Sequence, residues 1–260
     1  MIKILKIKNK DKIFDTSKVI LKILKKEKVC VLRGLIKKKE IQKILSHFKK
    51  KFNFSKDIRY SGELTLQKKD FQRLDIGNTY KNTRFMRVMY ANERSNHNSK
   101  LFHIINPVIN LRNSISRIKK IDYTYPFIKG ISKTIDKKYY SFCDFVRLIQ
   151  YPTGGGFLAQ HNDYDKYYAK GVYQIIMPLT NIKKTPYTNL GNFEKGGIYF
   201  ILKNKKKFIE NFFKLGDVLI FDPKANHGVD SIDSDKGLNL KNLCGRITLA
   251  LSITHFKNKS

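Results

Sequence analysis

In the N-terminal half of the chain, apolar residues recur every three to four positions, which is the spacing of one helix face. The pattern predicts three helices: one capped by Thr16 or Ser17 and running to about Lys28, one over about Lys38 to Phe52, and one between about Asn98 and Arg117. Pro107 should kink or split the third helix. The run Val29 to Leu32 predicts a short buried strand. Residues 55–94 are polar and irregular, and they give no assignment.

From about Tyr139 the pattern changes to short apolar runs separated by Gly, Pro, Asn and Asp. Five strands are predicted: Phe142 to Tyr151, Gly171 to Leu179, Gly197 to Leu202, Val218 to Phe221 and Ile247 to Thr254. Such strands between turn signals are typical of a β-sandwich or jelly roll rather than of β-α-β units. We therefore expect an α+β protein with a single domain over residues 1–260. In it, a mainly helical part (1–138) would support and cover a β-core (139–256).

The composition agrees with a folded domain. With 41% hydrophobic residues, 18 Phe and 14 Tyr, the chain can build a sizeable core. No apolar stretch approaches the ~20 residues of a membrane span, and lysines interrupt every apolar run near the N-terminus, so no signal peptide is expected. Three widely spaced cysteines argue against a disulfide scaffold or a zinc ribbon. A cytoplasmic protein is expected.

The charge is strongly positive: 53 Lys+Arg against 21 Asp+Glu give a net charge of +32. One interpretation is a polyanion partner such as nucleic acid. The other, which we favour, is the codon bias of an AT-rich coding sequence, because 43 of the 53 basic residues are lysines scattered in short runs. A phosphate-binding stripe would favour arginine and interleaved aromatic residues. Neither a membrane nor an obligate protein partner is indicated.

Three residues form a candidate metal site. His161 and Asp163 are two apart after the turn Gly154 to Gly156, so in an extended segment both side chains reach the same side. His227 follows the predicted strand Val218 to Phe221 through a short polar loop. Two imidazoles and one carboxylate make the facial triad of non-haem Fe(II) oxygenases, which leaves three coordination positions open.

Arg246 opens the last predicted strand, where alternation places it on the same face as Thr248. An arginine inside an apolar barrel needs an anionic partner, because an unpaired buried charge is costly. The far carboxylate of 2-oxoglutarate would supply one, with help from the Thr248 hydroxyl. The alternative is an ion pair with a structural carboxylate of the protein itself.

At these motifs the chain resembles a known family. The stretch QYPTGGGFLAQHND (150–163), followed in order by MPLTN, GGIYF, LGDVLIFDPKANHGVD and GRITLALS, is similar to the double-stranded β-helix core of the Fe(II)/2-oxoglutarate-dependent dioxygenases, in particular the prolyl-hydroxylase-like branch. The resemblance covers residues 139–256, although the gap between His227 and Arg246 is longer than usual in the family, with Asp230 to Leu243 as an inserted loop.

The resemblance implies a function and a role for each matching residue. His161, Asp163 and His227 would bind iron, Arg246 would anchor 2-oxoglutarate, and Tyr151 would contact the same cosubstrate. The expected reaction uses Fe(II), 2-oxoglutarate and O2, releases succinate and CO2, and hydroxylates a C–H bond. The carboxylate of Asp163 argues against halogenation, because related halogenases have a small residue in its place.

The substrate is less clearly indicated. Alternation places Arg147 on the face of Tyr151, where it would bind a substrate carboxylate or form a structural ion pair. Arg73 belongs to a segment that could cover the iron. The first hypothesis is a hydroxylase of a small polar molecule such as a free amino acid. A peptide hydroxylase, a nucleic-acid dealkylase of the AlkB type (disfavoured by Ser252) and a non-enzymatic binding module are the alternatives.

Overall fold

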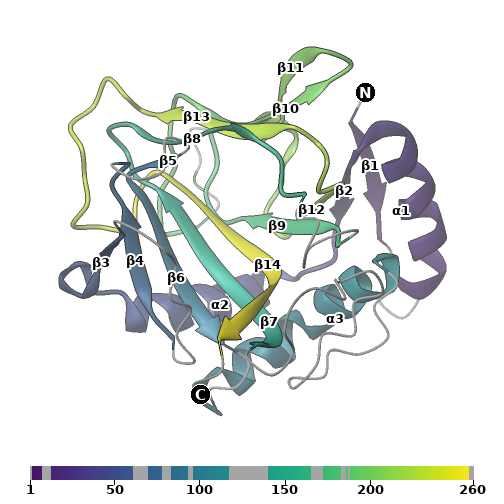
Figure 1. Cartoon of the computed structure of the whole chain (residues 1–260), viewed down its shortest axis with the longest axis horizontal. Helices are drawn as coiled ribbons and strands as arrows, with labels where there is room; N and C mark the ends of the chain where they lie inside the picture. Colours follow the sequence, from purple (N-terminus) through teal and green to yellow (C-terminus); the bar gives the residue numbers. More distant parts are fainter. Residues whose placement is uncertain are drawn as a thin grey trace.

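The structure is a computed structural model of the chain. It describes residues 2–7, 13–60, 70–77, 83–92, 96–116, 140–164, 172–182, 186 and 188–257. Within them lie three α-helices, two β-sheets and short 3₁₀ turns, arranged as a sandwich of the two sheets with the helices on one outer side (Figure 1).

The three helices are close to the predicted ones: α1 (Ile13–Glu27), α2 (Lys38–Lys51) and α3 (Ser99–Ile115). The predicted cap of α1 is wrong, because the helix begins at Ile13 and already contains Thr16 and Ser17. The prediction that Pro107 splits α3 is also wrong. Ile105, Val108 and Ile109 on both sides of the proline are buried, and this packing maintains the helix across the missing backbone hydrogen bond.

The larger sheet has nine strands. Their order is β1 (Lys3–Lys6), β2 (Val29–Arg33), β12 (Val218–Phe221), β9 (Gln174–Pro178), β14 (Arg246–Lys257), β7 (Tyr140–Tyr151), β6 (Met86–Asn92), β4 (Gln72–Asp75) and β3 (Ile58–Tyr60). The smaller sheet has the order β11 (Lys205–Phe208), β10 (Gly197–Leu202), β13 (His227–Ile232), β8 (Gly156–His161) and β5 (Thr83–Arg84).

Residues 55–94 are more regular than their sequence indicates, since they contain β3, β4, β5 and β6. β6 pairs with β7 along six residues and β4 pairs with β6, so these strands extend the larger sheet beyond the predicted core. Charged residues such as Arg87 interrupt the apolar alternation in this segment. The structure pairs Arg87 with a carboxylate inside the protein, and this tertiary contact overrides the local pattern.

Two separate cores follow from the alternation of side chains along the larger sheet. On one face Leu32, Leu148 and Leu249 pack against the buried faces of α1, α2 and α3. On the other face Val31, Val88 and Leu219 meet Ile198, Phe200 and Val229 of the smaller sheet. The second core therefore lies between the sheets. Among the described residues no helix is long and apolar enough to cross a membrane.

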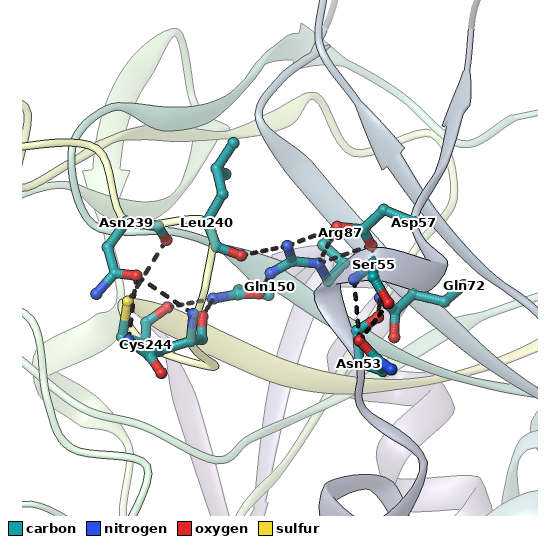
Figure 2. A network of polar contacts seen from close by, with 10 residues as sticks. Asn53, Ser55, Asp57, Gln72, Arg87, Gln150, Asn239, Leu240 and Cys244 are labelled. Atoms are coloured by element: carbon teal, nitrogen blue, oxygen red, sulfur yellow. Dashed lines mark hydrogen bonds and ion pairs between the residues drawn. The ribbon is translucent and has the colours of Figure 1, made fainter.

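The predicted inserted loop, Asp230 to Leu243, begins later than expected, because β13 runs to Ile232. A buried polar network ties this loop to the larger sheet (Figure 2). Arg87 is fully buried and donates to both carboxylate oxygens of Asp57 and to the carbonyl of Leu240. Gln150, which accepts a hydrogen bond from Arg87, donates to the carbonyls of Asn242 and Cys244. The inserted residues are thus fixed just before Arg246 by contacts from β6 and β7.

Because Arg87 is fully buried, its positive charge must be balanced inside the protein, and the carboxylate of Asp57 balances it. We expect Asp57→Ala to lower the free energy of unfolding by about 3–5 kcal/mol, since it leaves a buried cation without its anionic partner. Asp230→Ala, which breaks the more exposed pair with Lys206, should cost less than about 1 kcal/mol. Urea unfolding followed by circular dichroism measures both. Equal losses for the two variants would contradict this account of Arg87.

Candidate functional site

The two histidines of the predicted triad meet across a strand pair. His161 is the last residue of β8, and His227 is the first residue of β13. The antiparallel register places these two residues directly opposite each other, and their ring centroids lie 4.4 Å apart. Opposite residues in such a pair project to the same face. Two residues separated by 66 positions are therefore brought together by backbone pairing.

Asp163 completes a cluster that could hold a metal ion. One carboxylate oxygen lies 3.4 Å from His161 Nε2, and the other lies 3.6 Å from His227 Nε2. One ligand atom from each of the three residues lies within 4.8 Å of the others. In the described part of the chain, these three residues form a cluster of the size that one ion can bridge.

The imidazoles are oriented by the backbone. His161 Nδ1 lies 2.9 Å from the carbonyl oxygen of Ala159, and His227 Nδ1 lies 3.0 Å from that of Ala225. A carbonyl can only accept, so each Nδ1 carries a hydrogen. In the neutral imidazole the lone pair is then on Nε2, on the side of Asp163, and this is the tautomer that a metal requires.

Further contacts fix the segments that carry these ligands. The Asp163 N–H donates to the carbonyl oxygen of Pro223 at 2.9 Å, which ties the segment after β8 to the loop before His227. Phe200 stacks on the His227 ring with centroids 5.4 Å apart, and Phe221 meets it edge-on at 4.8 Å. Rotation of His227 is thus restricted by aromatic packing, and the donor set is held before any ion binds.

The charges of the cluster support one another. Burial alone would lower the pKa of His161, but the hydrogen bond and charge of Asp163, with the Ala159 carbonyl, raise it above its ordinary value. Burial would raise the pKa of Asp163, but the two imidazoles and Arg147 lower it. Burial lowers the pKa of His227. At neutral pH the site therefore offers a carboxylate and a neutral, buried His227.

A cavity of about 180 Å³ extends from this cluster between the two sheets. Three cross-strand pairs of β7 and β14 contribute to its wall: Tyr151 with Arg246, Ile149 with Thr248, and Arg147 with Ala250. The predicted placement of Arg147 on the face of Tyr151 agrees with this wall, to which Ile149 between them also contributes. The smaller sheet and β9 close the cavity with Leu158, Ile198, Val229, Gln174 and Ile176.

Arg246 lines the same cavity and is more deeply buried than Asp163. Its side chain is 2% exposed, and its guanidinium carbon lies 5.7 Å from the centre of the Tyr151 ring. Burial raises the pKa of Tyr151 to about 12, so the phenol is neutral. Arg246 Nε donates to Glu210, whereas the buried Nη2 has no hydrogen-bond partner. Sequence reasoning missed Glu210, which lies in an apolar run between the GGIYF and LGDVLIFDPKANHGVD segments and belongs to neither.

The two arginines predicted to bind substrate differ in position. Arg147 reaches the cavity wall, and its buried Nε has no hydrogen-bond partner. Arg73 does not line the cavity: its Nη2 lies 3.2 Å from Asp75, and its guanidinium packs over Tyr90 at 5.7 Å from the ring centre. The structure therefore brings Arg147, but not Arg73, to the predicted site.

Comparisons with known proteins support the fold. No family model matches the sequence, and no curated protein is similar to it at a significant level. Solved structures do match. A Pseudomonas putida prolyl-4-hydroxylase is 10% identical, with 94% of this chain and 100% of the other covered and a TM-score of 0.53. A Trichoplax adhaerens prolyl hydroxylase in complex with a peptide of hypoxia inducible factor is 11% identical, with coverages of 93% and 90% and a TM-score of 0.52.

A third structure, a full-length Neurospora crassa protein in complex with alpha-KG (2-oxoglutarate) and 5-formyluracil, is 12% identical, with coverages of 98% and 83% and a TM-score of 0.54. The chain has the fold of the 2-oxoglutarate- and Fe(II)-dependent oxygenases. The predicted α+β class with a double-stranded β-helix core is therefore confirmed. At these identities the likeness concerns the fold, and the chemistry of this chain has to be argued from its own residues.

The raised pKa of His161 leads to a prediction for metal binding. A metal ion and a proton compete for the same Nε2 lone pair, so each ion bound below this pKa displaces a proton. We expect the apparent affinity for Fe(II) or Co(II) to rise by up to about tenfold per pH unit between pH 6 and the pKa of His161. Calorimetry in buffers with different ionisation enthalpies measures both the affinity and the proton release. An affinity independent of pH over this range would argue against His161 as a ligand.

Proposed function

We propose that the protein is an Fe(II)- and 2-oxoglutarate-dependent dioxygenase that hydroxylates a small polar substrate. The observation that carries the proposal is the position of two complementary groups in one cavity. His161, Asp163 and His227 form a cluster that could hold a metal ion, and the same cavity is lined by a buried arginine, Arg246, with a free donor. Fe(II) held by the cluster, with 2-oxoglutarate and O2, would supply the oxidant for a C–H bond. One oxygen atom of O2 would enter the substrate and the other the succinate that forms as 2-oxoglutarate loses CO2.

The chemistry of the three side chains fits Fe(II). His227 presents a neutral Nε2, His161 offers its Nε2 once a metal ion displaces the proton, and Asp163 adds one negative charge. Together they make the two-imidazole, one-carboxylate donor set of non-haem iron. Three protein ligands leave positions open for a cosubstrate and O2. Because the Asp163 carboxylate would fill the coordination position that a halide ion takes in the related halogenases, we expect hydroxylation rather than halogenation.

The part of the cavity at Arg246 could bind a carboxylate. The unpaired Nη2 of Arg246 is a buried donor, and a buried donor without a partner is costly unless a ligand supplies an acceptor. The Thr248 side chain and the neutral Tyr151 phenol lie beside it on the cavity wall. We assign Arg246, Thr248 and Tyr151 to 2-oxoglutarate, whose tail carboxylate would accept from Nη2.

The iron and cosubstrate assignment has a direct spectroscopic test. Anaerobic addition of Fe(II) and 2-oxoglutarate to the protein should produce a weak visible charge-transfer band. His161→Ala and Asp163→Ala should abolish the band, whereas His103→Ala, which changes a histidine of α3 outside the cavity, should leave it intact. A wild-type protein that binds neither Fe(II) nor 2-oxoglutarate would refute the proposal.

Arg147 supports a substrate that carries a carboxylate. It lies on the cavity wall, its charge lowers the pKa of Asp163, and its buried Nε is unpaired. A cavity of about 180 Å³ leaves little room beside 2-oxoglutarate, which favours a molecule of amino-acid size. A peptide that projects one side chain into the cavity is the second candidate, since two of the matching structures are prolyl hydroxylases.

Substitution of Arg147 should separate substrate binding from cosubstrate binding. In a screen of succinate release against free amino acids, peptides and alkylated oligonucleotides, we expect Arg147→Met to raise the KM for the stimulating substrate by about 10–100-fold, the cost of one buried charge pair. The affinity for 2-oxoglutarate should change by less than about threefold, far below that cost. Arg84→Met, a change at an exposed arginine of β5, is the matched control. Stimulation by oligonucleotides alone would refute the small-substrate assignment.

A further inference from the structure

Glu210 is a buried carboxylate to which the proposed chemistry gives no role. It begins the short 3₁₀ turn η4 (Glu210–Phe212), between β11 and β12, and its side chain is 4% exposed. Its Oε1 accepts a hydrogen bond from the backbone N–H of Ile198 at 2.9 Å and another from Arg246 Nε. The carboxylate therefore connects the start of strand β10 to the buried guanidinium of Arg246.

The absence of a side chain at Gly197 leaves room for the side chain of Glu210. Gly197 has a φ of +118°, and a Cβ built on it would lie 2.4 Å from Glu210 Cγ. Any other residue at this position would displace the glutamate, in addition to the backbone strain. Gly197 and the N–H of Ile198 thus form a cradle that holds the carboxylate independently of Arg246.

The contact has two effects on Arg246. Because the guanidinium is a planar fork with fixed donor directions, a bond at Nε sets the direction in which Nη2 points. The same bond gives the buried cation a counter-ion when the cavity contains no cosubstrate, and an unpaired buried cation would strongly destabilise the fold. A carboxylate that arrived at Nη2 would then share one guanidinium with Glu210, and the two negative charges would repel each other.

We propose that Glu210 is the resident counter-ion of Arg246: it orients the anchor and stabilises the empty cavity, and it lowers the affinity of the anchor for the tail carboxylate of 2-oxoglutarate. The inference rests on the proposed function, since it requires that 2-oxoglutarate binds at Arg246. Glu210 is a positioning residue in this scheme, because it acts through Arg246.

The variant Glu210→Gln tests the inference because glutamine keeps an acceptor for both hydrogen bonds but has no charge. We expect the affinity for 2-oxoglutarate, measured by anaerobic titration with Fe(II), to increase about tenfold as the repulsion between the two carboxylates is removed. The midpoint of thermal unfolding without 2-oxoglutarate should fall. Glu210→Ala also removes the acceptor, so it should bind 2-oxoglutarate more weakly than Glu210→Gln does.

Glu194→Gln is the matched control, since this glutamate is 67% exposed and pairs with Lys236 at the surface. It should shift neither quantity. A folded Glu210→Gln variant with unchanged or weaker affinity for 2-oxoglutarate would overturn the inference and leave the proposed function intact. A wild-type protein that does not bind 2-oxoglutarate would overturn both.

A measurement on the wild-type protein keeps the inference testable even if Glu210→Gln does not fold. The probe is 2-oxopentanoate, which has the same chain as 2-oxoglutarate without the tail carboxylate. If Glu210 already compensates Arg246, the preference for 2-oxoglutarate should be less than about a hundredfold, near the lower end of what a buried charge pair contributes. A larger preference would overturn the inference, because Arg246 would then act as an uncompensated cation.

Discussion

The need to pair each buried arginine with a carboxylate organises much of this structure. Arg87, Arg112 and Arg246 are among the largest fully buried side chains, and each contacts one acidic residue from a distant part of the chain: Asp57, Asp144 and Glu210. Loss of a partner from a buried pair is strongly destabilising, whereas its presence adds little stability by itself. The pairs therefore act mainly by specifying which segments meet.

The position of each pair shows what it specifies. Arg112 and Asp144 join α3 to β7. Arg87 and Asp57 join β6 to the segment before β3 and, through Leu240, to the inserted loop. The loop leads directly into β14, so this pair also determines where Arg246 enters the sheet, opposite Tyr151. With 21 acidic residues for 53 basic ones, most cations cannot have such a partner, and the surface carries the excess.

The site could be predicted where local spacing determines the geometry. His161 and Asp163 are two residues apart, and Arg147, Ile149 and Tyr151 alternate along one strand, so a period of two is enough to place each set on one face. The register between β8 and β13, which sets His227 opposite His161, was not predicted, because neither strand is among the five that the sequence indicated. His227 was proposed from its position after the strand Val218 to Phe221. Glu210 escaped prediction because its role arises from contacts with Ile198 and Arg246, and the sequence around it has no distinguishing pattern.

The residues that line the cavity differ in their exposure to solvent. Arg246, Thr248 and Tyr151 are each at most 4% exposed, so a group bound there is enclosed by the protein. The Asp163 side chain is 33% exposed, and Arg147 stands beside it with intermediate exposure. A group that binds beside Asp163 and Arg147 would stay in contact with water. The difference in exposure across the cavity therefore agrees with the proposed roles, because the cosubstrate carboxylate would bind in the interior and the substrate nearer the surface.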